Sequence, residues 1–276
     1  CAYCYARPYH EYLGFNAGLD FESKIMVKPR AAELLEEALA RRSWRPEVLA
    51  CSGVTDCYQP VERELQMTRQ CLEVLAEFRN PVAMITKNHL ITRDVDLLGS
   101  LAEHGAAAAV ISVTTLDAEL ARVMEPRAST PKFRLDALRE LSAAGIPTGV
   151  SLAPVIPGLN EHEMPAILEA AAGCGASFAF YTVVRLPHGV KDLFDTWLAE
   201  HVPGQRDKVL GRIRELRDGD LNESEFGTRM RGSGRLADEL SRMFRVACRK
   251  HGLNRKRVEL SIDAFRRVSP GQMELF

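Results

Sequence analysis

Short apolar runs alternate with longer amphipathic stretches through the first two thirds of the chain. The apolar runs lie at residues 47–51, 82–86, 107–113, 148–153 and 177–184. Each run is too short for a typical helix, and helical apolar spacing follows the first four of them, which predicts a repeating unit of strand and helix. Strands that are apolar on both faces are typical of parallel sheets that are covered on both sides.

The amphipathic stretches predict helices at residues 31–42, 60–78, 94–104, 132–143 and 163–172. Gly105, Gly145 and Gly173 close three of these helices, as glycine does at helix C-termini. A short alternating segment at 24–28 predicts one more strand near the start.

These elements predict an α/β fold, a partial (β/α)6 TIM-like barrel with a C-terminal helical extension. Five strands are visible in the sequence, and a sixth is expected ahead of Cys1. After Pro187 the pattern changes to charged helices at 190–217 and 235–251, joined by a link that is rich in glycine. We therefore expect a barrel at 1–187, a basic helical extension at 188–268 that caps the open edge of the barrel, and a flexible tail at 269–276.

The composition is that of an ordinary intracellular enzyme. The 276 residues are 46% hydrophobic and 26% charged, enough to bury a substantial core. The cysteines number seven and lack the spacing of a disulfide framework, which favours a reducing cytoplasm. No apolar run approaches the roughly 18 residues of a membrane span, and no signal-peptide pattern is visible, so we expect no membrane partner.

The net charge of −1 hides an asymmetry along the chain. Residues 1–200 carry 19 Lys and Arg against 26 Asp and Glu, whereas residues 201–276 carry 17 against 11. A basic segment of this kind points to a polyanionic partner such as DNA or RNA. It is equally typical of a solvated helical face that is rich in arginine.

Cys1 and Cys4 form a C-x-x-C pair beside aromatic residues, the only such spacing in the chain. This spacing serves redox disulfides, zinc sites and iron–sulfur clusters alike. A zinc site calls for a second pair, and the other cysteines, at 51, 57, 71, 174 and 248, never repeat the spacing. A thioredoxin-like site opens a helix, which Arg7-Pro8 interrupts here. The cluster is the remaining interpretation.

The run Cys1-Ala-Tyr-Cys-Tyr-Ala-Arg-Pro8 resembles the end of the C-x-x-x-C-x-x-C signature of the radical S-adenosylmethionine (SAM) superfamily. Thr55-Asp-Cys-Tyr-Gln-Pro-Val-Glu62 and Phe226-Gly-Thr-Arg-Met-Arg231 resemble stretches of its DNA repair photolyase-like members, relatives of spore photoproduct lyase. The similarity extends over essentially the whole chain. The family's third cluster cysteine is expected four residues ahead of Cys1, so we interpret the sequence as truncated there.

The resemblance implies a [4Fe–4S] cluster with Cys1 and Cys4 as ligands, and a SAM molecule at its open iron. Lys87 is the candidate for the SAM carboxylate, Ser112 for the ribose and Asp56 for the amino group. The candidate cofactor-binding residues are Tyr3, Ser52, Gly53, Thr55, Asp56, Lys87, Ser112, Thr114, Ile156 and Gly158. Taken without the family, residues 52–56 and Pro157-Gly158 are also ordinary turns, and a lone lysine is also a solvated one.

Three further residues have open roles. Glu125 and Arg127 follow the fourth expected strand of the barrel, where they bind substrate or SAM, or simply pair with each other. Cys57 is a candidate hydrogen-atom donor, because relatives use a thiol near this loop to return a hydrogen atom to a product radical. The neighbouring Cys51 fits better as a small core residue.

The last residues, Gln272-Met-Glu-Leu-Phe276, resemble the peptide with which bacterial DNA repair proteins dock on the sliding clamp. Gln272 would enter a polar pocket, and Leu275 and Phe276 would anchor in an apolar one. A bacterial sliding clamp is therefore an expected partner. An electron donor is the second, because the cluster must be reduced.

By resemblance, the chain is an enzyme that cleaves SAM to a 5′-deoxyadenosyl radical, with damaged or modified nucleic acid as the leading substrate and lyase-like chemistry. A radical SAM enzyme that acts on a peptide, a tRNA or a small molecule is the first alternative. A non-catalytic protein that binds zinc, nucleic acid or the clamp is the second.

Overall fold

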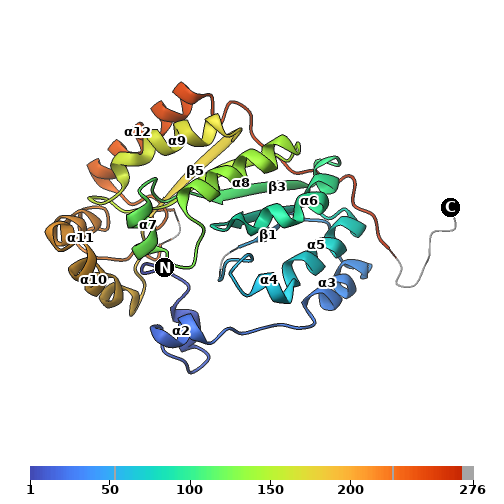
Figure 1. The fold of residues 1–276 in the computed structure, drawn as a ribbon, viewed down its shortest axis with the longest axis horizontal. Helices are drawn as coiled ribbons and strands as arrows, with labels where there is room; N and C mark the ends of the chain where they lie inside the picture. Colours follow the sequence, from blue (N-terminus) through green and yellow to red (C-terminus); the bar gives the residue numbers. More distant parts are fainter. Residues whose placement is uncertain (53, 226, 269–276) are drawn as a thin grey trace.

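A computed structural model describes residues 1–52, 54–225 and 227–268. Its centre is a parallel sheet of five strands in the order β1-β2-β3-β4-β5, so each strand pairs with the next one in the chain (Figure 1). The strands are β1 (Leu49–Cys51), β2 (Val82–Thr86), β3 (Ala107–Ser112), β4 (Thr148–Val155) and β5 (Phe178–Val183). All five predicted strands of the barrel are confirmed, and the fold is an α/β partial barrel.

Helices connect and cover the strands. Before the sheet lie α1 (Pro8–Glu11), α2 (Leu19–Ser23) and α3 (Ala31–Ala40). Between the strands lie α4 (Glu62–Leu65), α5 (Met67–Phe78), η1 (His89–Asp94), α6 (Val95–Ala102), α7 (Ala118–Met124), α8 (Pro131–Ala143), η2 (Glu161–Glu163) and α9 (Met164–Gly173). After the sheet follow α10 (Val190–His201), η3 (Pro203–Gln205), α11 (Arg206–Glu215) and α12 (Gly234–His251).

The core lies between the sheet and its helices. Every residue of β3 is buried, from Ala107 to Ser112. This central strand contacts α6 and α8, and β4 contacts α8 and α9. The run of small alanines in β3 lets the helices approach closely, while the leucines of α5, α6 and α8 fill the space between them.

The prediction of a strand at residues 24–28 is wrong. These residues are exposed and no strand is assigned there. Lys24 instead pairs with Asp20, 3.0 Å away, and lies over the ring of Phe15 at 4.6 Å from its centroid. An alternating pattern needs a neighbouring strand to become a sheet, and this segment pairs with none in the described part of the chain.

Three predicted helices differ in their course. The helix expected at 60–78 is divided into α4 and α5, because Gln66 takes a left-handed conformation with φ of 51°. The helix expected at 94–104 begins earlier, as the 3-10 turn η1, where the Asn88 side chain accepts from the backbone N–H of Leu90. The helix expected at 190–217 is broken before Pro203, whose ring cannot continue a helix.

The helices after Pro187 lie at one side of the sheet. In α12, Phe244 packs its ring 4.9 Å from that of Tyr181 of β5, and the helix lies beside α9 (Figure 1). In α10, Trp197 donates from its indole N–H to the carbonyl of Val123 in α7, 3.1 Å away. The α10–α11 pair thus covers the connections that leave β3 and β4.

The segment after α12 runs along the edge where the strands begin. The Asn254 side chain bonds the N–H and the carbonyl of Ala179 in β5, at 2.8 and 3.0 Å. Further along, the backbone of Ser261 bonds Gly105 ahead of β3, and that of Arg266 bonds Phe78 ahead of β2. The opposite edge, where the strands end, is left to the loops of the candidate site. No helix within the described ranges is long and apolar enough to cross a membrane.

Candidate active site

The cysteine loop is a single tight turn at the end of the sheet where the strands finish. The N–H of Cys4 bonds the carbonyl of Cys1 at 3.3 Å, and the N–H of Ala2 bonds the carbonyl of Met124 at 3.1 Å. Both thiols are free and partly exposed, whereas Tyr3 between them is buried. The turn therefore points Tyr3 into the protein and leaves the two cysteines at the surface. We call this end of the barrel, where the strands finish, the mouth.

Arg7 fixes the path of the chain that follows. Its guanidinium is 4% exposed and donates to the carbonyls of Cys1, at 3.1 and 3.3 Å, and Ala17, at 2.8 Å. It also pairs with the Glu22 carboxylate. One arginine thus closes the loop from the cysteine turn to α2. Because Arg7 has five donors and a fixed planar shape, it can hold several carbonyls at once where lysine could not.

Glu125 joins the cysteine loop to the barrel. Its carboxylate is buried and accepts hydrogen bonds from the hydroxyls of Tyr3 and Thr114. It also pairs with the guanidinium of Arg134, which is almost completely buried and donates to the carbonyl of Ser112 at 3.1 Å. Glu125 therefore ties together the cysteine loop, the end of β3 and the helix α8.

Lys87 lies beside this carboxylate at the end of β2. Its ammonium donates to the carbonyl of Ala153 in β4 at 2.7 Å and lies 3.8 Å from Glu125. Burial, and secondly the positive charge of Arg134, lower the pKa of Lys87 to about 8. A partly buried ammonium with donors to spare suits a site that receives an anionic group.

Asp56 closes the loop that follows β1. One of its oxygens accepts from the Thr86 hydroxyl at 2.5 Å and from the backbone N–H of Tyr58 at 2.9 Å, and the other accepts from the N–H of Lys87 at 2.8 Å. A carboxylate offers about four acceptor positions. Asp56 thus anchors its loop to β2 and keeps one position for a further donor, such as an ammonium.

Asn160 shapes the loop that follows β4. Its side chain accepts from the N–H of Ile156 at 2.6 Å and donates to the carbonyl of Thr114 at 2.8 Å. Gly158 lies within this loop at φ of 91°, and a Cβ there would come within 3.2 Å of the backbone of Val209. A glycine is required on both grounds. The loop is therefore held against the end of β3 on one side and against α11 on the other.

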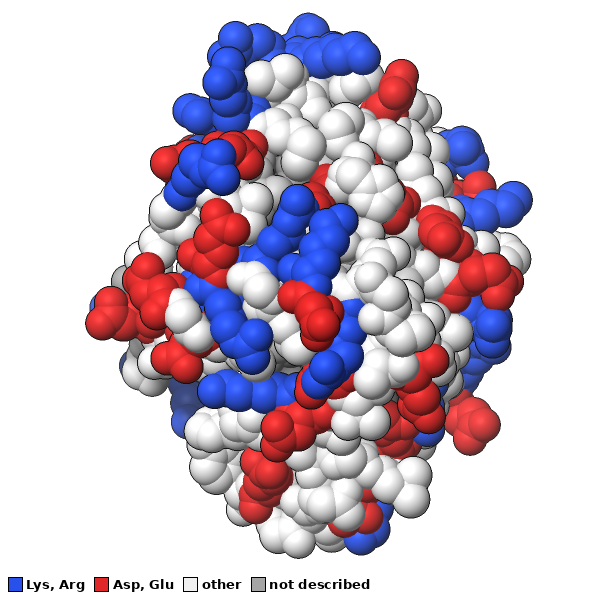
Figure 2. All heavy atoms as spheres, turned by 90° about the vertical axis from the view of Figure 1, so that its left-hand side faces the viewer, with Lys and Arg blue, Asp and Glu red and all other residues white. Residues whose placement is uncertain are grey.

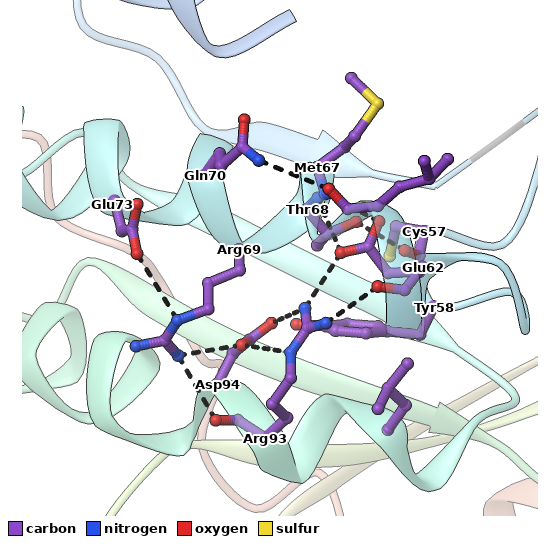
Figure 3. Close-up of polar contacts among 12 residues, drawn as sticks. Cys57, Tyr58, Glu62, Met67, Thr68, Arg69, Gln70, Glu73, Arg93 and Asp94 are labelled. Atoms are coloured by element: carbon purple, nitrogen blue, oxygen red, sulfur yellow. Dashed lines mark hydrogen bonds and ion pairs between the residues drawn. The ribbon is translucent and has the colours of Figure 1, made fainter. Parts of the chain in front are cut away.

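The loop after β1 continues into a buried polar cluster (Figure 3). Glu62 accepts from the backbone N–H groups of Met67 and Thr68 at the start of α5, at 3.1 and 2.9 Å. Arg93 pairs with Glu62 at 3.0 Å and with Asp94 at 2.8 Å. Glu62 thus caps α5, the helix that begins after Gln66. Much of the Thr55–Glu62 motif therefore serves to stabilise the fold.

Cys57 is placed beneath the same loop. Its thiol lies 3.6 Å from the carbonyl of Cys51 and 4.0 Å from that of Ile85. Burial, with the Asp56 carboxylate as the next cause, raises the pKa of Cys57 well above its usual value. Burial also raises the pKa of Cys51 to about 11. Both groups are therefore thiols, not thiolates, at neutral pH.

The structure brings together four of the predicted site residues, Tyr3, Lys87, Thr114 and Glu125, in one network. Glu125 and Arg127 do not pair with each other: Arg127 is exposed and donates to the carbonyl of Glu22. Ser52 and Thr55 are exposed in the loop after β1. Gly53, Gln272, Leu275 and Phe276 lie outside the described residues, so the predictions for them stay predictions.

Cys1 and Cys4 fit two positions of a cluster ligand set. They are free, partly exposed and three residues apart, as thiolate ligands of a cluster require. Across the described ranges, no group of three or more His, Cys, Asp or Glu residues is placed to hold a metal ion. The two cysteines therefore fit part of a three-thiolate site, and none of those ranges contains a complete zinc site.

The match to a family model identifies the class of protein to which this site belongs. The model described as the radical SAM superfamily matches residues 1–171, which include the cysteine loop, Lys87 and Glu125. The chain belongs to the radical SAM superfamily. The matched range ends within α9, so it includes four of the five strands and the loops that build the site.

Relatives of this radical SAM chain occur in bacteria and archaea. An uncharacterized protein of Mycobacterium tuberculosis is 34% identical over 218 residues, which are 78% of this chain and 63% of the relative. An uncharacterized protein of Methanocaldococcus jannaschii is 26% identical over 163 residues, 59% of this chain and 58% of the relative. The chain thus spans about three fifths of the length of these relatives.

Among solved structures, the fold is similar to that of spore photoproduct lyase. A mutant of that enzyme with bound AdoMet and dinucleoside spore photoproduct gives a TM-score of 0.59 at 17% identity, and covers 92% of this chain and 71% of the other. At this identity the likeness concerns the fold. It extends beyond the barrel to most of the helices that follow it.

Three residues of the site were not singled out from the sequence. Arg7 was noted only in the Arg7-Pro8 interruption and in the family resemblance, and Arg134 only as one residue of the predicted helix at 132–143. Asn160 ended a turn that was noted for its glycine. Their signal is structural, because each is a buried polar side chain that joins segments distant in sequence. Only a fold can show that.

Replacing Glu125 by Gln removes the charge that offsets Arg134 while it keeps the volume. Because loss of one partner leaves a buried charge uncompensated, we expect the free energy of unfolding to fall by about 3 kcal/mol. Urea unfolding of both proteins measures this. The control is Glu119→Gln in the neighbouring α7, an exposed carboxylate, which should change stability little. If both variants lowered the free energy of unfolding equally, the Glu125 network would contribute no more to stability than an exposed carboxylate does.

Lys87 gives the stability a defined pH dependence. Its pKa is about 8 in the folded protein and about 10.4 when unfolded, so between these values the unfolded chain binds the extra proton and stability rises with pH. Relative to Lys87→Met, the wild type should gain up to about 1.4 kcal/mol per pH unit above pH 8. Urea unfolding of both proteins at pH 7 to 10 measures the difference, and a difference that does not change would contradict a lowered pKa.

Proposed function

We propose that this radical SAM protein is an enzyme that acts on damaged or modified nucleic acid, with lyase-like chemistry. The observation that carries the proposal is the cysteine loop itself, which Tyr3 and Glu125 fasten to the ends of the parallel strands. Active sites of barrel folds gather at this edge, where the loops after several strands converge. The function of the complete protein is part of the proposal, because the chain spans only part of its relatives.

Cys1 and Cys4 would hold the [4Fe–4S] cluster together with a third ligand. When bound, the cluster would supply the electron that cleaves SAM into methionine and a 5′-deoxyadenosyl radical. Lys87 would bind the SAM carboxylate through donors not used by Ala153. The remaining acceptor position of Asp56 would receive the ammonium of SAM. Ser112 and Thr114, which are buried at the end of β3, would bind the hydroxyls of the ribose.

The loop after β4 would form the apolar wall for the adenine. Ile156 and Gly158 are buried, and Asn160 holds their backbone in place from within. A flat base needs a surface that does not shift, and the backbone of a pinned loop supplies one. Pro157, also buried, lies between them.

The fold likeness to spore photoproduct lyase supports the choice of nucleic acid as substrate. The distribution of charge does not add to this support. The face formed by α10 and α11 mixes both signs (Figure 2), with Arg206 paired to Asp195 at 2.7 Å. Much of the positive excess lies in the second half of α12 and just after it, near the start of β5. That is the edge of the sheet opposite the cysteine loop.

The proposed activity is tested with the complete gene product, reconstituted with iron and sulfide without oxygen. We expect a brown protein that releases 5′-deoxyadenosine when a reductant is added, and more of it with ultraviolet-damaged DNA than with intact DNA, tRNA or peptides. Cys1→Ser with Cys4→Ser should remove both colour and product, while Cys71→Ser, a partly buried cysteine of α5, should keep them. A colourless protein that carries zinc would favour the non-catalytic alternative.

We further propose Cys57 as the residue that returns a hydrogen atom to the product. Its high pKa keeps the S–H bond intact at neutral pH. Transfer breaks that bond, forms a C–H bond on the product and leaves a thiyl radical, which one electron and one proton from the electron donor restore. Cys57→Ala should therefore change the ratio of products measured by chromatography, whereas Cys51→Ala should not. Unchanged ratios in both variants would remove Cys57 from this role.

A further inference from the structure

Arg185 stands at the rim of the mouth, two residues after the end of β5. Its guanidinium carbon lies 4.6 Å from the ring centroid of Tyr5, the residue that follows Cys4. Throughout the described ranges no carboxylate lies within ion-pair distance of Arg185. Burial, with the nearby charge of Arg229 as a further cause, lowers the pKa of Arg185. A half-buried cation that meets another cation and no anion is a ready site for an anionic ligand.

The segment that carries Arg229 is built against β5. The N–H of Val183 bonds the carbonyl of Met230 at 2.8 Å, so the segment adds to the edge of the sheet. Arg217, 3% exposed, donates to the carbonyls of Val184 and Thr228, at 3.0 and 3.3 Å, and joins the strand end to the segment from behind. The backbone that carries Arg229 is therefore fixed to the end of β5.

Gly232 shows that this placement is specified by the sequence. It takes φ of 77°, and a Cβ there would come within 3.0 Å of the carbonyl oxygen of Leu216. Only glycine fits both conditions. In addition, the Nε atom of Arg217 and the hydroxyl of Thr228 are buried and find no hydrogen-bond partner in the described part of the chain. The turn that presents Arg229 thus retains unused hydrogen-bonding groups.

Exposed tyrosines lie beside Arg185. Tyr5, Tyr9 and Tyr12 are 39%, 47% and 79% exposed. Arg185 interacts electrostatically with both Tyr5 and Tyr9, so Arg185 and these two tyrosines lie close together. The rings of Tyr9 and Tyr12 meet edge to face with centroids 6.2 Å apart. Exposed rings of this size are costly in water and are typical of surfaces that stack ligands.

We propose that Arg185, Arg229, Tyr9 and Tyr12 form a binding site for an unpaired stretch of the nucleic-acid substrate. The two arginines hold a phosphodiester, and the two tyrosines stack the bases beside it. Cations that alternate with exposed aromatic rings are the surface that binds single strands, and an enzyme that acts on a base must take that base out of the stack. Tyr5 of the same rim directly follows Cys4, so the site would place the neighbouring nucleotide beside the cysteine loop. The inference rests on the proposed function.

The test measures the affinity of the complete protein for a fluorescent single-stranded oligonucleotide at several salt concentrations. Arg185→Gln with Arg229→Gln should weaken binding at least tenfold and lower the slope of log K against log salt by about 0.7 for each phosphate that is no longer neutralised. Tyr9→Ala with Tyr12→Ala should also weaken binding about tenfold, with the slope unchanged, because stacking releases no counterions. A matched duplex should bind more weakly than the single strand.

The matched control is Arg249→Gln with Lys250→Gln, which removes the same charge from the exposed end of α12. It should change affinity less than twofold. An equal loss in the control and the rim variant overturns the rim site but leaves nucleic acid as substrate. SAM affinity, measured by calorimetry, should be unchanged in the rim variants, and its loss with oligonucleotide binding intact would assign Arg185 to SAM. No binding of any oligonucleotide, with SAM cleavage retained, would overturn both the site and the substrate class.

Discussion

The buried carboxylate of Glu125 is the interaction on which the site depends. The cysteine loop, the end of β3 and the helix α8 share this acceptor, through Tyr3, Thr114 and Arg134. A carboxylate without these donors would be costly to bury, and an Arg134 without the carboxylate would be costlier still. The loop and the barrel are therefore stable in this arrangement only together. This explains how a turn of four residues, in which Tyr3 also packs into the core, holds two thiols at the mouth.

Other polar side chains around the mouth also join neighbouring elements through hydrogen bonds. Asp56 ties the loop after β1 to β2, and Asn160 ties the loop after β4 to β3. Lys87 reaches from β2 to the carbonyl of Ala153 in β4, across the intervening strand. Each bond joins elements that are neighbours in space and distant in sequence. Loops that are fixed in this way can present backbone groups to a cofactor without a further entropic cost of ordering.

The sequence predicted the sheet well because its evidence is local. Runs such as Ala107–Ser112 are apolar throughout, and only a covered parallel strand requires that. Helix interruptions escaped prediction, since the left-handed turn at Gln66 depends on Glu62, which accepts from the next helix. The site was predicted by resemblance for the cysteines and by strand-end position for Lys87. The pairing of Glu125 with Arg134, and not with Arg127, follows from burial that no local pattern reveals.

The two ends of the sheet are used for different purposes, and the charge of the chain follows that division. At the edge where the strands begin, the segment after α12 bonds Ala179, Gly105 and Phe78 in turn and places its basic residues in water. At the edge where the strands end, several cations are held by other groups: Lys87 by a carbonyl, Arg134 by a carboxylate, Arg185 by an aromatic ring. Net charge by segment does not distinguish the two edges, because it also counts the solvated cations of the far edge. Specific recognition of an anionic substrate depends on the few cations that are desolvated and aimed, since a charge in water is already screened.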